Sequence, residues 1–246
     1  MLETKLNFEQ LQNYKIPAYF YSEDLLAKQY LALKNSLPHD FGIYYSMKAN
    51  SNLDVVQCLK GLGAFADVAS FRELQMALQC GYLGKEIEFT GPGKSKEALQ
   101  LAIENNLASI VIESLQELEL INAIAEDLEK RANISIRINP KKFYAQNGKL
   151  IDSSSTQFGL DEESLPAFHD KLKQMVHVDC VGLHVFTQSQ FLNAQLLIQN
   201  FKSTFEIAKQ FTKDLHQPLA IVNLGGGFGI SYYKEDQFLD LTILKA

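Results

Sequence analysis

The first 140 residues contain five short apolar runs at nearly equal steps along the chain. The runs are centred near Ile43, Phe65, Ile87, Ile110 and Ile134, at steps of 22, 22, 23 and 24 residues. Each run has the length of a buried strand, and the segments between them carry apolar residues at helical spacing. This period predicts a repeated strand and helix unit, and therefore a parallel sheet with helices packed on it.

The segments between the runs also carry signals that start and end helices. Ser70 with Glu73, and Ser114 with Glu117, have the spacing of a capping box, and Gly81 stands where a glycine commonly ends a helix. The pattern before and after these segments predicts helices over 24–36, 162–175 and 193–213, strands over 178–187 and 219–224, and a long polar loop over 141–156.

The predicted strands number seven, and their near-constant spacing favours an α/β barrel of the TIM (β/α)8 type over an open doubly wound sheet. Only 17 residues, 230–246, follow Gly229, so we expect an incomplete barrel that lacks its eighth strand. Residues 16–21 predict a short strand outside the repeat. We therefore expect residues 1–22 to be an N-terminal segment whose strand joins another domain, and residues 23–246 to form the barrel.

Composition and charge exclude several classes of function. The chain has 246 residues, 46% of them hydrophobic, and a formal net charge of −6 without basic runs, which argues against nucleic acid or an anionic membrane as a partner. No apolar run approaches the roughly 18 residues of a membrane span, and residues 1–12 lack the pattern of a secretory signal. Cys58, Cys80 and Cys180 have no CxxC spacing, which predicts reduced core thiols, no metal site and a cytoplasmic protein.

Two features at the ends of predicted strands indicate the chemistry. Lys48 follows the apolar run 41–47, and Gly225, Gly226 and Gly227 follow the last predicted strand. In a parallel barrel the reactive groups belong to the carboxyl ends of the strands. Three successive glycines can turn their backbone amides onto a phosphate, or they form a plain tight turn. A strand-end lysine facing a phosphate loop suggests a phosphorylated aldehyde bound as a Schiff base, which is the chemistry of pyridoxal phosphate.

Polar groups on other predicted strands have two interpretations each. His184 and Phe186 share one face of a strand, so facing inward they press against a planar ring, and facing outward they pack between sheet and helices. Arg137 is costly to bury alone, so it pairs with a carboxylate such as Asp67 or Glu113, or it anchors a polar ligand. The same alternatives apply to Asp67. The sequence leaves these pairs of interpretations open.

Seven segments, in order along the chain, together carry a resemblance to known proteins. The segments are Tyr45–Asn50, Asp67–Ser70, Phe89–Lys94, Arg137–Pro140, Gln157–Gly159, Gly182–Phe186 and Leu224–Gly227. They are similar to segments of the alanine-racemase-fold pyridoxal-phosphate-dependent decarboxylases, which include diaminopimelate, ornithine and carboxynorspermidine decarboxylases. The similarity extends from about Ile16 to Leu244.

The resemblance implies a barrel of the alanine racemase type that binds pyridoxal 5'-phosphate. It implies decarboxylation of an amino acid, with a diamino acid as the expected small-molecule substrate class, and homodimers among full-length members. Lys48 is implied as the catalytic lysine that bonds to the cofactor aldehyde until the substrate amine displaces it. The implied cofactor-binding residues are Lys48, Asp67, Arg137, His184, Phe186, Ser189, Gly225, Gly226 and Gly227.

The sequence departs from the family pattern in three places. Phe186 stands where many members carry a second histidine, and Gln188 replaces a glycine; a phenylalanine can stack on a ring but cannot donate a hydrogen bond. The loop 142–159 lacks the His and Thr-Gly features typical of diaminopimelate enzymes and is more similar to the branch acting in siderophore- and antibiotic-type pathways. Members also continue with an eighth strand, whose Glu-Pro-Gly-Arg glutamate pairs with the pyridine nitrogen, and with a β-domain.

These departures set the functional expectation. We expect an N-terminal portion of a pyridoxal-phosphate-dependent decarboxylase with little activity by itself. One alternative is a chain that pairs with a separately encoded C-terminal half. Another is a non-catalytic pyridoxal-phosphate carrier or regulatory homologue.

Overall fold

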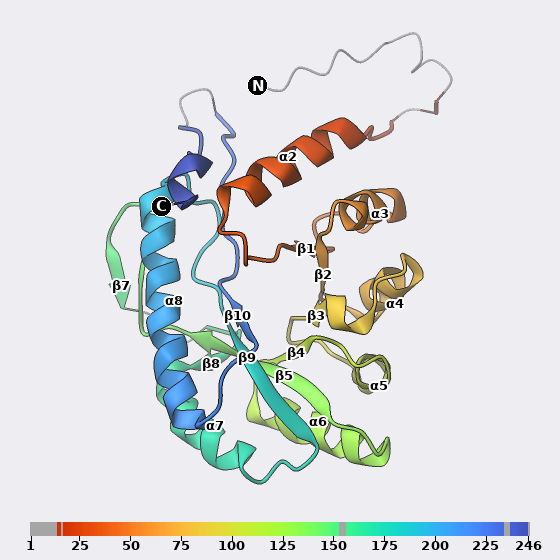
Figure 1. The fold of residues 1–246 in the computed structure, drawn as a ribbon, viewed down its shortest axis with the longest axis vertical. Coiled ribbons are helices and arrows are strands. Elements are labelled where there is room, and N and C mark those ends of the chain that lie inside the picture. Colours follow the sequence, from red (N-terminus) through yellow and green to blue (C-terminus); the bar gives the residue numbers. More distant parts are fainter. Residues whose placement is uncertain (1–13, 16, 153–155, 234–236, 246) are drawn as a thin grey trace.

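The computed structural model describes residues 14–15, 17–152, 156–233 and 237–245, and every structural statement below refers to these residues. Seven strands form one parallel sheet in which their order in space is their order in the chain, and a two-residue strand, β8 (Leu160–Asp161), adds to the middle of it. The sheet curves into a partial barrel (Figure 1), which confirms the predicted incomplete barrel. Its strands are β1 (Tyr44–Ser46), β2 (Phe65–Val68), β3 (Ile87–Phe89), β4 (Ser109–Ile112), β5 (Ala132–Asn139), β9 (Val178–Val185) and β10 (Ile221–Asn223).

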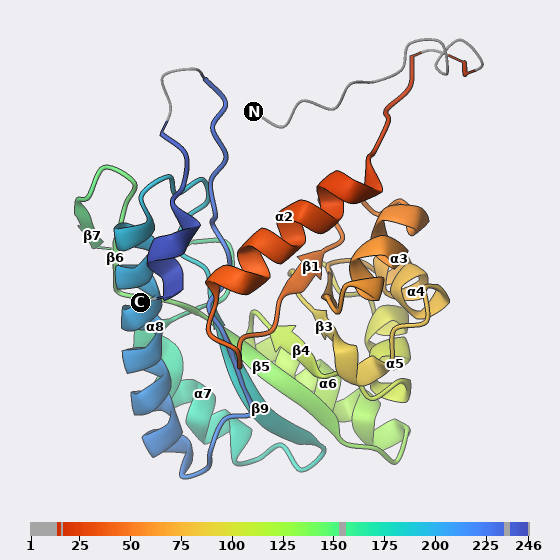
Figure 2. The same ribbon diagram turned by 45° about the horizontal axis from the view of Figure 1, so that its top comes forward.

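Helices follow the strands and cover the outer face of the sheet (Figure 2). The first helix, α2 (Glu23–Ser36), instead crosses the opening of the partial barrel, contacting α3 on one side and the C-terminal 3-10 turn on the other. The others are α3 (Leu53–Gly61), α4 (Phe71–Gln79), α5 (Lys96–Glu104), α6 (Leu115–Asp127), α7 (Leu165–Leu172) and α8 (Ala194–Leu215), with 3-10 turns η1 (Gly84–Glu86), η2 (Glu162–Ser164) and η3 (Leu241–Lys245).

The predicted capping boxes are present at the starts of α4 and α6. The Ser70 hydroxyl accepts a hydrogen bond from the Glu73 amide at 3.2 Å. The Glu73 carboxylate reaches back one residue further than expected and accepts from the Ala69 amide at 2.8 Å. Ser114 and Glu117 repeat this arrangement at α6. Each box satisfies free amides of the first helical turn, and so it fixes where the strand ends and the helix begins.

The two faces of the sheet differ sharply in chemistry. Because side chains alternate along a strand, every second residue faces the helices and the residues between them face the barrel interior. The outward set is apolar and at most 1% exposed, and comprises Ala66, Val68, Ile87, Phe89, Ile110, Ile112, Ile134, Ile136, Ile138, Leu183 and Val185. The inward set is mainly polar, and comprises Tyr44, Ser46, Asp67, Glu88, Ser109, Ser135, Arg137, His184 and Asn223, together with the apolar Phe65, Val111 and Ile221.

Several sequence-based boundaries differ from the structure, and β10 is shorter than the strand expected over 219–224. The polar segment 141–156 is not a plain loop, since it contains an antiparallel hairpin of β6 (Lys142–Tyr144) and β7 (Leu150–Asp152). The buried Asn200 side chain of α8 holds this hairpin by accepting from the Tyr144 amide at 2.8 Å and donating to the Tyr144 carbonyl at 2.9 Å. The helix expected over 162–175 is the shorter α7 preceded by η2, and β9 ends two residues before 187.

The remaining expectations concern the cysteines and the N-terminal segment. All three cysteines are free thiols. Cys80 and Cys180 are buried in the core as predicted, whereas Cys58 is half-buried and lies outside it. Residues 17–22 form no strand, and the assignment of 1–22 to a segment that joins another domain stays a prediction. In the part of the chain that the structure describes, we find no helix with the length and apolar character to cross a membrane.

Candidate functional site

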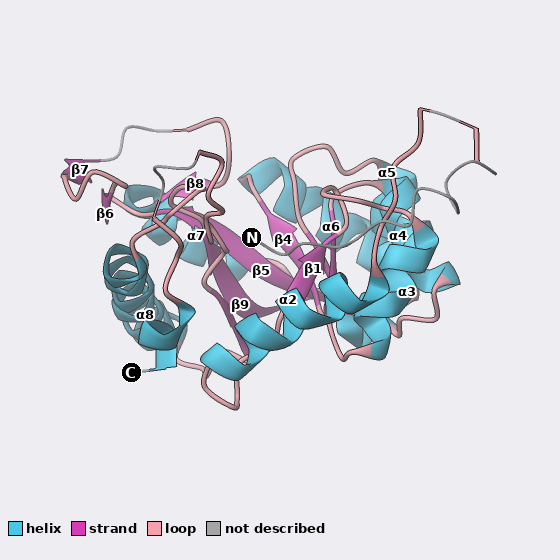
Figure 3. Ribbon diagram, turned by 90° about the horizontal axis from the view of Figure 1, so that it is seen from above, coloured by secondary structure: helices cyan, strands magenta, loops and turns pink. Residues whose placement is uncertain are grey.

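Lys48 lies in the turn that follows the carboxyl end of β1. Figure 3 shows β1 and the rest of the sheet from above. The Met47 amide donates to the Asp67 carbonyl at 2.9 Å, which extends the pairing of β1 and β2 by one residue. The Ala49 amide donates to the Ser46 carbonyl at 3.1 Å and closes the turn. Hydrogen bonds therefore hold the backbone on both sides of Lys48, while its side chain is exposed at the rim of the barrel.

Asp67 lies on β2, next to the strand that delivers Lys48. Its carboxylate accepts hydrogen bonds from the hydroxyls of Ser46 and Thr90, both at 2.7 Å. Burial raises the pKa of Asp67, and the two hydroxyls and the positive charges of Lys48 and Arg137 oppose this shift without reversing it. The carboxyl group is thus fixed between β1 and β3, within electrostatic reach of Lys48.

Arg137 pairs with Glu113, which decides between the alternatives left open by the sequence. The Arg137 guanidinium and the Glu113 carboxylate are 3.2 Å apart, and their side chains are 14% and 4% exposed. The guanidinium also lies over the Phe158 ring, 4.7 Å from its centre. The other Glu113 oxygen accepts from the Gly159 amide at 3.2 Å, and Gly159 has a φ of +69° that favours glycine. The pair therefore holds the segment 156–159 over the inner face.

His184 faces inward from β9, between Arg137 on β5 and Asn223 on β10. Burial first, and then the positive charges of Arg137 and Lys48, lower its pKa to about 3. The imidazole is therefore neutral near pH 7. Its Nδ1 is buried and has no hydrogen-bond partner among the described residues. The inward interpretation of the sequence is the one the structure supports, and this nitrogen has a free hydrogen-bonding valence.

The three glycines after β10 form a loop packed against the end of β9. Gly225 and Gly227 have φ values of +71° and +84°, in the region that only glycine enters without strain. A Cβ added to Gly225 would lie 2.7 Å from the Val185 carbonyl oxygen and 3.1 Å from Phe186. A Cβ on Gly226 would meet nothing within 4 Å, so the backbone there faces open space.

Two further segments complete the rim around the glycine loop. The Phe191 amide donates to the Gly227 carbonyl at 2.7 Å, and the Phe191 carbonyl accepts from the Gly229 amide at 2.8 Å. Ser189, one of the predicted site residues, is exposed, and its carbonyl accepts from the Gln146 side chain at the tip of the hairpin at 2.7 Å. The hairpin, the segment after β9 and the glycine loop are therefore linked to one another.

Lys94, the second lysine in the matching segments, has a structural role. Its side chain is fully buried, and its ammonium donates to the Val111 carbonyl at 2.7 Å and pairs with Glu117 at 2.9 Å. All of its bonding capacity is taken by carbonyls and a carboxylate near the end of β4. Of these two lysines, Lys48 is accordingly the one whose amine has no hydrogen bond or ion pair to another described residue.

Two inward-facing residues escaped the sequence analysis. Glu88 on β3 is fully buried, and Asn223 on β10 donates its amide to one Glu88 oxygen. Burial, followed by the nearby negative charge of Asp67, raises the pKa of Glu88 to about 8. The signal was present, because an acid between two apolar strand residues demands a partner for the same reason as Arg137.

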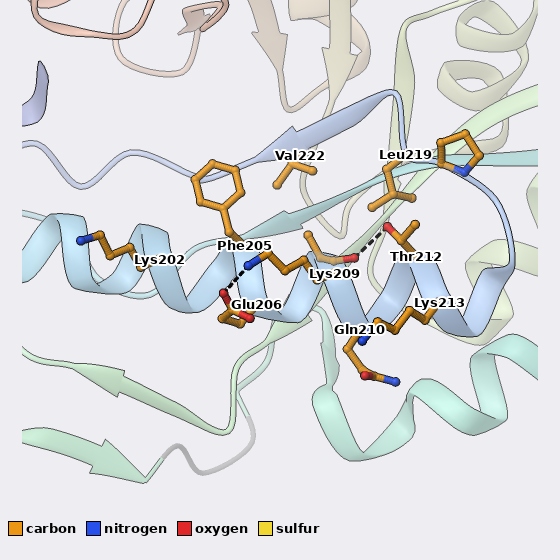
Figure 4. Close-up of a pocket in the computed structure, with 11 residues that line it drawn as sticks. Lys202, Phe205, Glu206, Lys209, Gln210, Thr212, Lys213, Leu219 and Val222 are labelled. Atoms are coloured by element: carbon orange, nitrogen blue, oxygen red, sulfur yellow. Dashed lines mark hydrogen bonds and ion pairs between the residues drawn. The ribbon is translucent and has the colours of Figure 1, made fainter. Parts of the chain in front are cut away.

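A pocket elsewhere on the molecule is unrelated to these residues. A groove of about 930 Å³ lies between α8 and β10 on the outer side of the sheet (Figure 4). Phe205, Leu219 and Val222 form its apolar floor, and lysines of α8 stand at its margin. None of the predicted site residues lines it, so we place the candidate site at the rim, where the polar groups converge.

The rim suits a group that carries an aldehyde, a planar ring and a phosphate. Lys48 offers a free amine, and the open backbone at Gly226 can face a phosphate. His184 has an unpaired buried nitrogen, and Phe186 is 37% exposed beside Gly225, so that its ring can contact a planar partner. The residues present therefore fit pyridoxal phosphate.

Comparison with known proteins identifies the family. The family described as "Pyridoxal-dependent decarboxylase, pyridoxal binding domain" matches residues 23–244. The L-glutamyl-[BtrI acyl-carrier protein] decarboxylase of Niallia circulans is 31% identical over 230 residues, which cover 94% of this chain and 54% of that protein. A diaminopimelate decarboxylase of Helicobacter pylori is 33% identical over 257 residues, which cover 97% of this chain and 63% of that protein.

Solved structures give the same result. The diaminopimelate decarboxylase of Methanocaldococcus jannaschii has a TM-score of 0.88 at 31% identity, over 97% of this chain and 57% of that one. The Helicobacter pylori enzyme complexed with L-lysine has a TM-score of 0.85 at 31% identity, over 97% of this chain and 61% of that one. The chain thus spans 54% and 63% of the length of the two curated relatives above. It belongs to the family of pyridoxal-dependent decarboxylases, whose pyridoxal-binding domain it contains.

Proposed function

We propose that this chain is the cofactor-binding portion of a pyridoxal-phosphate-dependent amino-acid decarboxylase. One observation carries the proposal. The turn with Lys48 and the loop Gly225–Gly227 stand at the carboxyl ends of the two outermost strands, β1 and β10, and the polar inner face extends between them. A reactive amine and a phosphate-sized stretch of bare backbone are thus held on one rim by a rigid sheet.

Each rim residue has a specific role in this proposal. When bound, pyridoxal phosphate supplies an aldehyde that bonds to amines and a ring that takes up the electron pair released as carbon dioxide leaves. Lys48 provides the amine, and Asp67 keeps negative charge beside it. The amides of Gly226 and Gly227 bind phosphate. His184, neutral at pH 7, offers its ring or its Nδ1 to the cofactor.

The remaining predicted residues have supporting roles. Phe186 lies against Gly225 and can stack on a planar ring without donating a hydrogen bond. Ser189 keeps the segment after β9 in place through the Gln146 contact to its carbonyl. Arg137 is already neutralised by Glu113, so we assign it to holding residues 156–159 beside the cofactor and not to binding a substrate carboxylate.

The substrate is proposed only as a class. Relatives named as diaminopimelate decarboxylases, and one named for a glutamyl group on a carrier protein, support an amino acid that loses its carboxylate. Because the curated relatives are longer than the matched region, we propose cofactor binding, with little turnover, for these 246 residues by themselves. A homodimer and a separately encoded C-terminal half are partner proposals that co-purification and sedimentation test. A cytoplasmic location stays a prediction.

The test compares cofactor binding with turnover. We expect purified chain mixed with pyridoxal phosphate to acquire a visible absorbance band that Lys48→Ala abolishes and Lys85→Ala, at an exposed lysine of η1, leaves unchanged. Release of carbon dioxide is measured in parallel with diaminopimelate, lysine and ornithine. A folded chain without the Lys48-dependent band contradicts the proposal. The band without carbon dioxide release, even after addition of a co-purifying partner, supports a carrier or regulatory role instead.

A further inference from the structure

The inner face contains a hydrogen bond that spans three strands of the sheet. The Asn223 amide nitrogen on β10 donates to a carboxyl oxygen of Glu88 on β3. Strands β4, β5 and β9 lie between these two in the sheet. The link is therefore possible only because the sheet curves, and it joins β10, an outermost strand, directly to β3 across the barrel interior. Glu88 is 0% exposed, so water does not compete for this bond.

The same Asn223 side chain holds the glycine loop. Its oxygen accepts a hydrogen bond from the Gly225 amide at 2.8 Å. Strand β10 has three residues and only β9 as a neighbour. The Phe191 hydrogen bonds hold the far end of the loop at Gly227 and Gly229, and Asn223 holds its first amide. Asn223 uses its nitrogen for Glu88 and its oxygen for the loop, and its rotamer is therefore set by two bonds at once.

The charges around Glu88 decide which carboxyl group of the interior holds a proton. Asp67 receives two hydroxyl bonds and faces Lys48 and Arg137, whereas Glu88 receives one amide bond and faces no cation. Burial and the Asp67 charge raise the pKa of Glu88 to about 8, so Glu88 is the neutral acid near pH 7. The groups that face Glu88 are Tyr44 on β1, Asp67 on β2, Ser109 on β4 and Asn223 on β10.

We propose that Glu88 is a positioning residue for the phosphate-binding loop, acting through Asn223. The inference rests on the proposed function of Gly225–Gly227. A neutral Glu88 orients Asn223 without placing a second negative charge beneath a dianionic phosphate. Asn223 in turn fixes the Gly225 amide, so that the following amides of the loop are ordered before the cofactor arrives and less conformational entropy is lost on binding.

The affinity of the chain for pyridoxal phosphate, followed through the Lys48-dependent absorbance, tests the proposal. Glu88→Leu should weaken binding about tenfold, because it leaves the nitrogen of the half-buried Asn223 without its acceptor. Glu88→Gln keeps the acceptor and should bind within about twofold of the unmodified chain at pH 7. Asn223→Ala and the double variant should bind equally weakly, because Glu88 acts only through Asn223. Ser109→Ala, a matched change at another inner-face neighbour of Glu88, should leave affinity unchanged.

Two measurements keep the inference separate from the proposed function. Hydrogen exchange of the Gly225 amide in the cofactor-free chain should be about tenfold faster in Glu88→Leu, even if no cofactor binds. As pH rises through about 8, binding should weaken in the unmodified chain relative to Glu88→Gln, which has no proton to lose. Equal exchange rates, additive losses in the double variant, or the same pH profile in Glu88→Gln would overturn the inference. Glu88→Gln also provides the test if Glu88→Leu does not fold.

Discussion

Replacing Glu88 by glutamine should remove a large pH dependence from the stability of the fold. The pKa of this buried acid is raised from 4.5 to about 8 in the folded chain. Because each pKa unit corresponds to about 1.4 kcal/mol, the shift is worth about 5 kcal/mol of unfolding free energy. This is a large share of the roughly 5–15 kcal/mol by which domains are stable.

The sign of the pH dependence follows from whether the folded and unfolded chains hold the Glu88 proton. Below about pH 4.5 both the folded and the unfolded chain hold it, and the stabilisation that comes from the raised pKa of Glu88 is fully present. Between about pH 4.5 and 8 the unfolded chain has lost the proton and the folded chain still holds it, so the free energy of unfolding falls as pH rises. Above about pH 8 both states are ionised and the decline stops. Glutamine at this position has no proton to lose and removes this slope.

The assay is urea denaturation at several pH values between about 5 and 9, followed by circular dichroism. Subtracting the Glu88→Gln curve from that of the unmodified chain cancels the contributions of groups that do not interact with Glu88. Asp67, whose charge raises the pKa of Glu88, remains in the difference. The difference should change by several kcal/mol across the window, with the variant more stable at the alkaline end. A difference that stays constant with pH would refute the assignment of the proton to Glu88.

Two further pairs of substitutions test the rim and the ion pair beneath it. Gly225→Ala should destabilise the fold by about 2 kcal/mol and weaken cofactor binding, because a residue with a Cβ is strained at the φ of +71° found there. Gly226→Ala should lower only the affinity for the cofactor, because a Cβ at that position meets no other atom. Urea titration measures the stability of each variant, and cofactor absorbance measures its affinity. Glu113→Gln should lower the free energy of unfolding by about 3 kcal/mol, because it leaves the charge of Arg137 without a counter-ion. Glu163→Gln, which breaks the exposed pair with Lys141, should change the free energy of unfolding by less than about 0.5 kcal/mol.

The sequence predicts the fold well because its signals are local. The spacing of apolar runs predicts the parallel strands in their spatial order, and the side chains of Ser70 and Glu73 define a helix start within one turn. The hairpin within 141–156 was missed because its stability comes from a distant residue, Asn200, which supplies both hydrogen bonds to β6. No pattern inside 141–156 contains that information.

The site was predicted in part. Lys48 and the three glycines were recognisable because each stands at a strand end with an unusual side-chain chemistry. The partner of Arg137 was left open, because the sequence analysis named Asp67 and Glu113 without comparing their strands. Glu113 follows β4, which pairs with β5 so that Ile112 lies opposite Ile136, whereas Asp67 lies on β2, two strands further away. The contact between Glu88 and Asn223 could not be predicted in this way, because it crosses the interior between strands that are not neighbours and depends on the curvature of the sheet.

The assignment of Lys48 is tested most directly by locating the cofactor on the chain. The folded chain, incubated with pyridoxal phosphate and reduced with borohydride, is digested and its peptides are weighed. We predict one pyridoxyl group per chain, on the peptide that contains Lys48, and none on the Lys48→Ala variant. A folded chain that is labelled equally on other lysines, or is not labelled at all, would contradict the assignment.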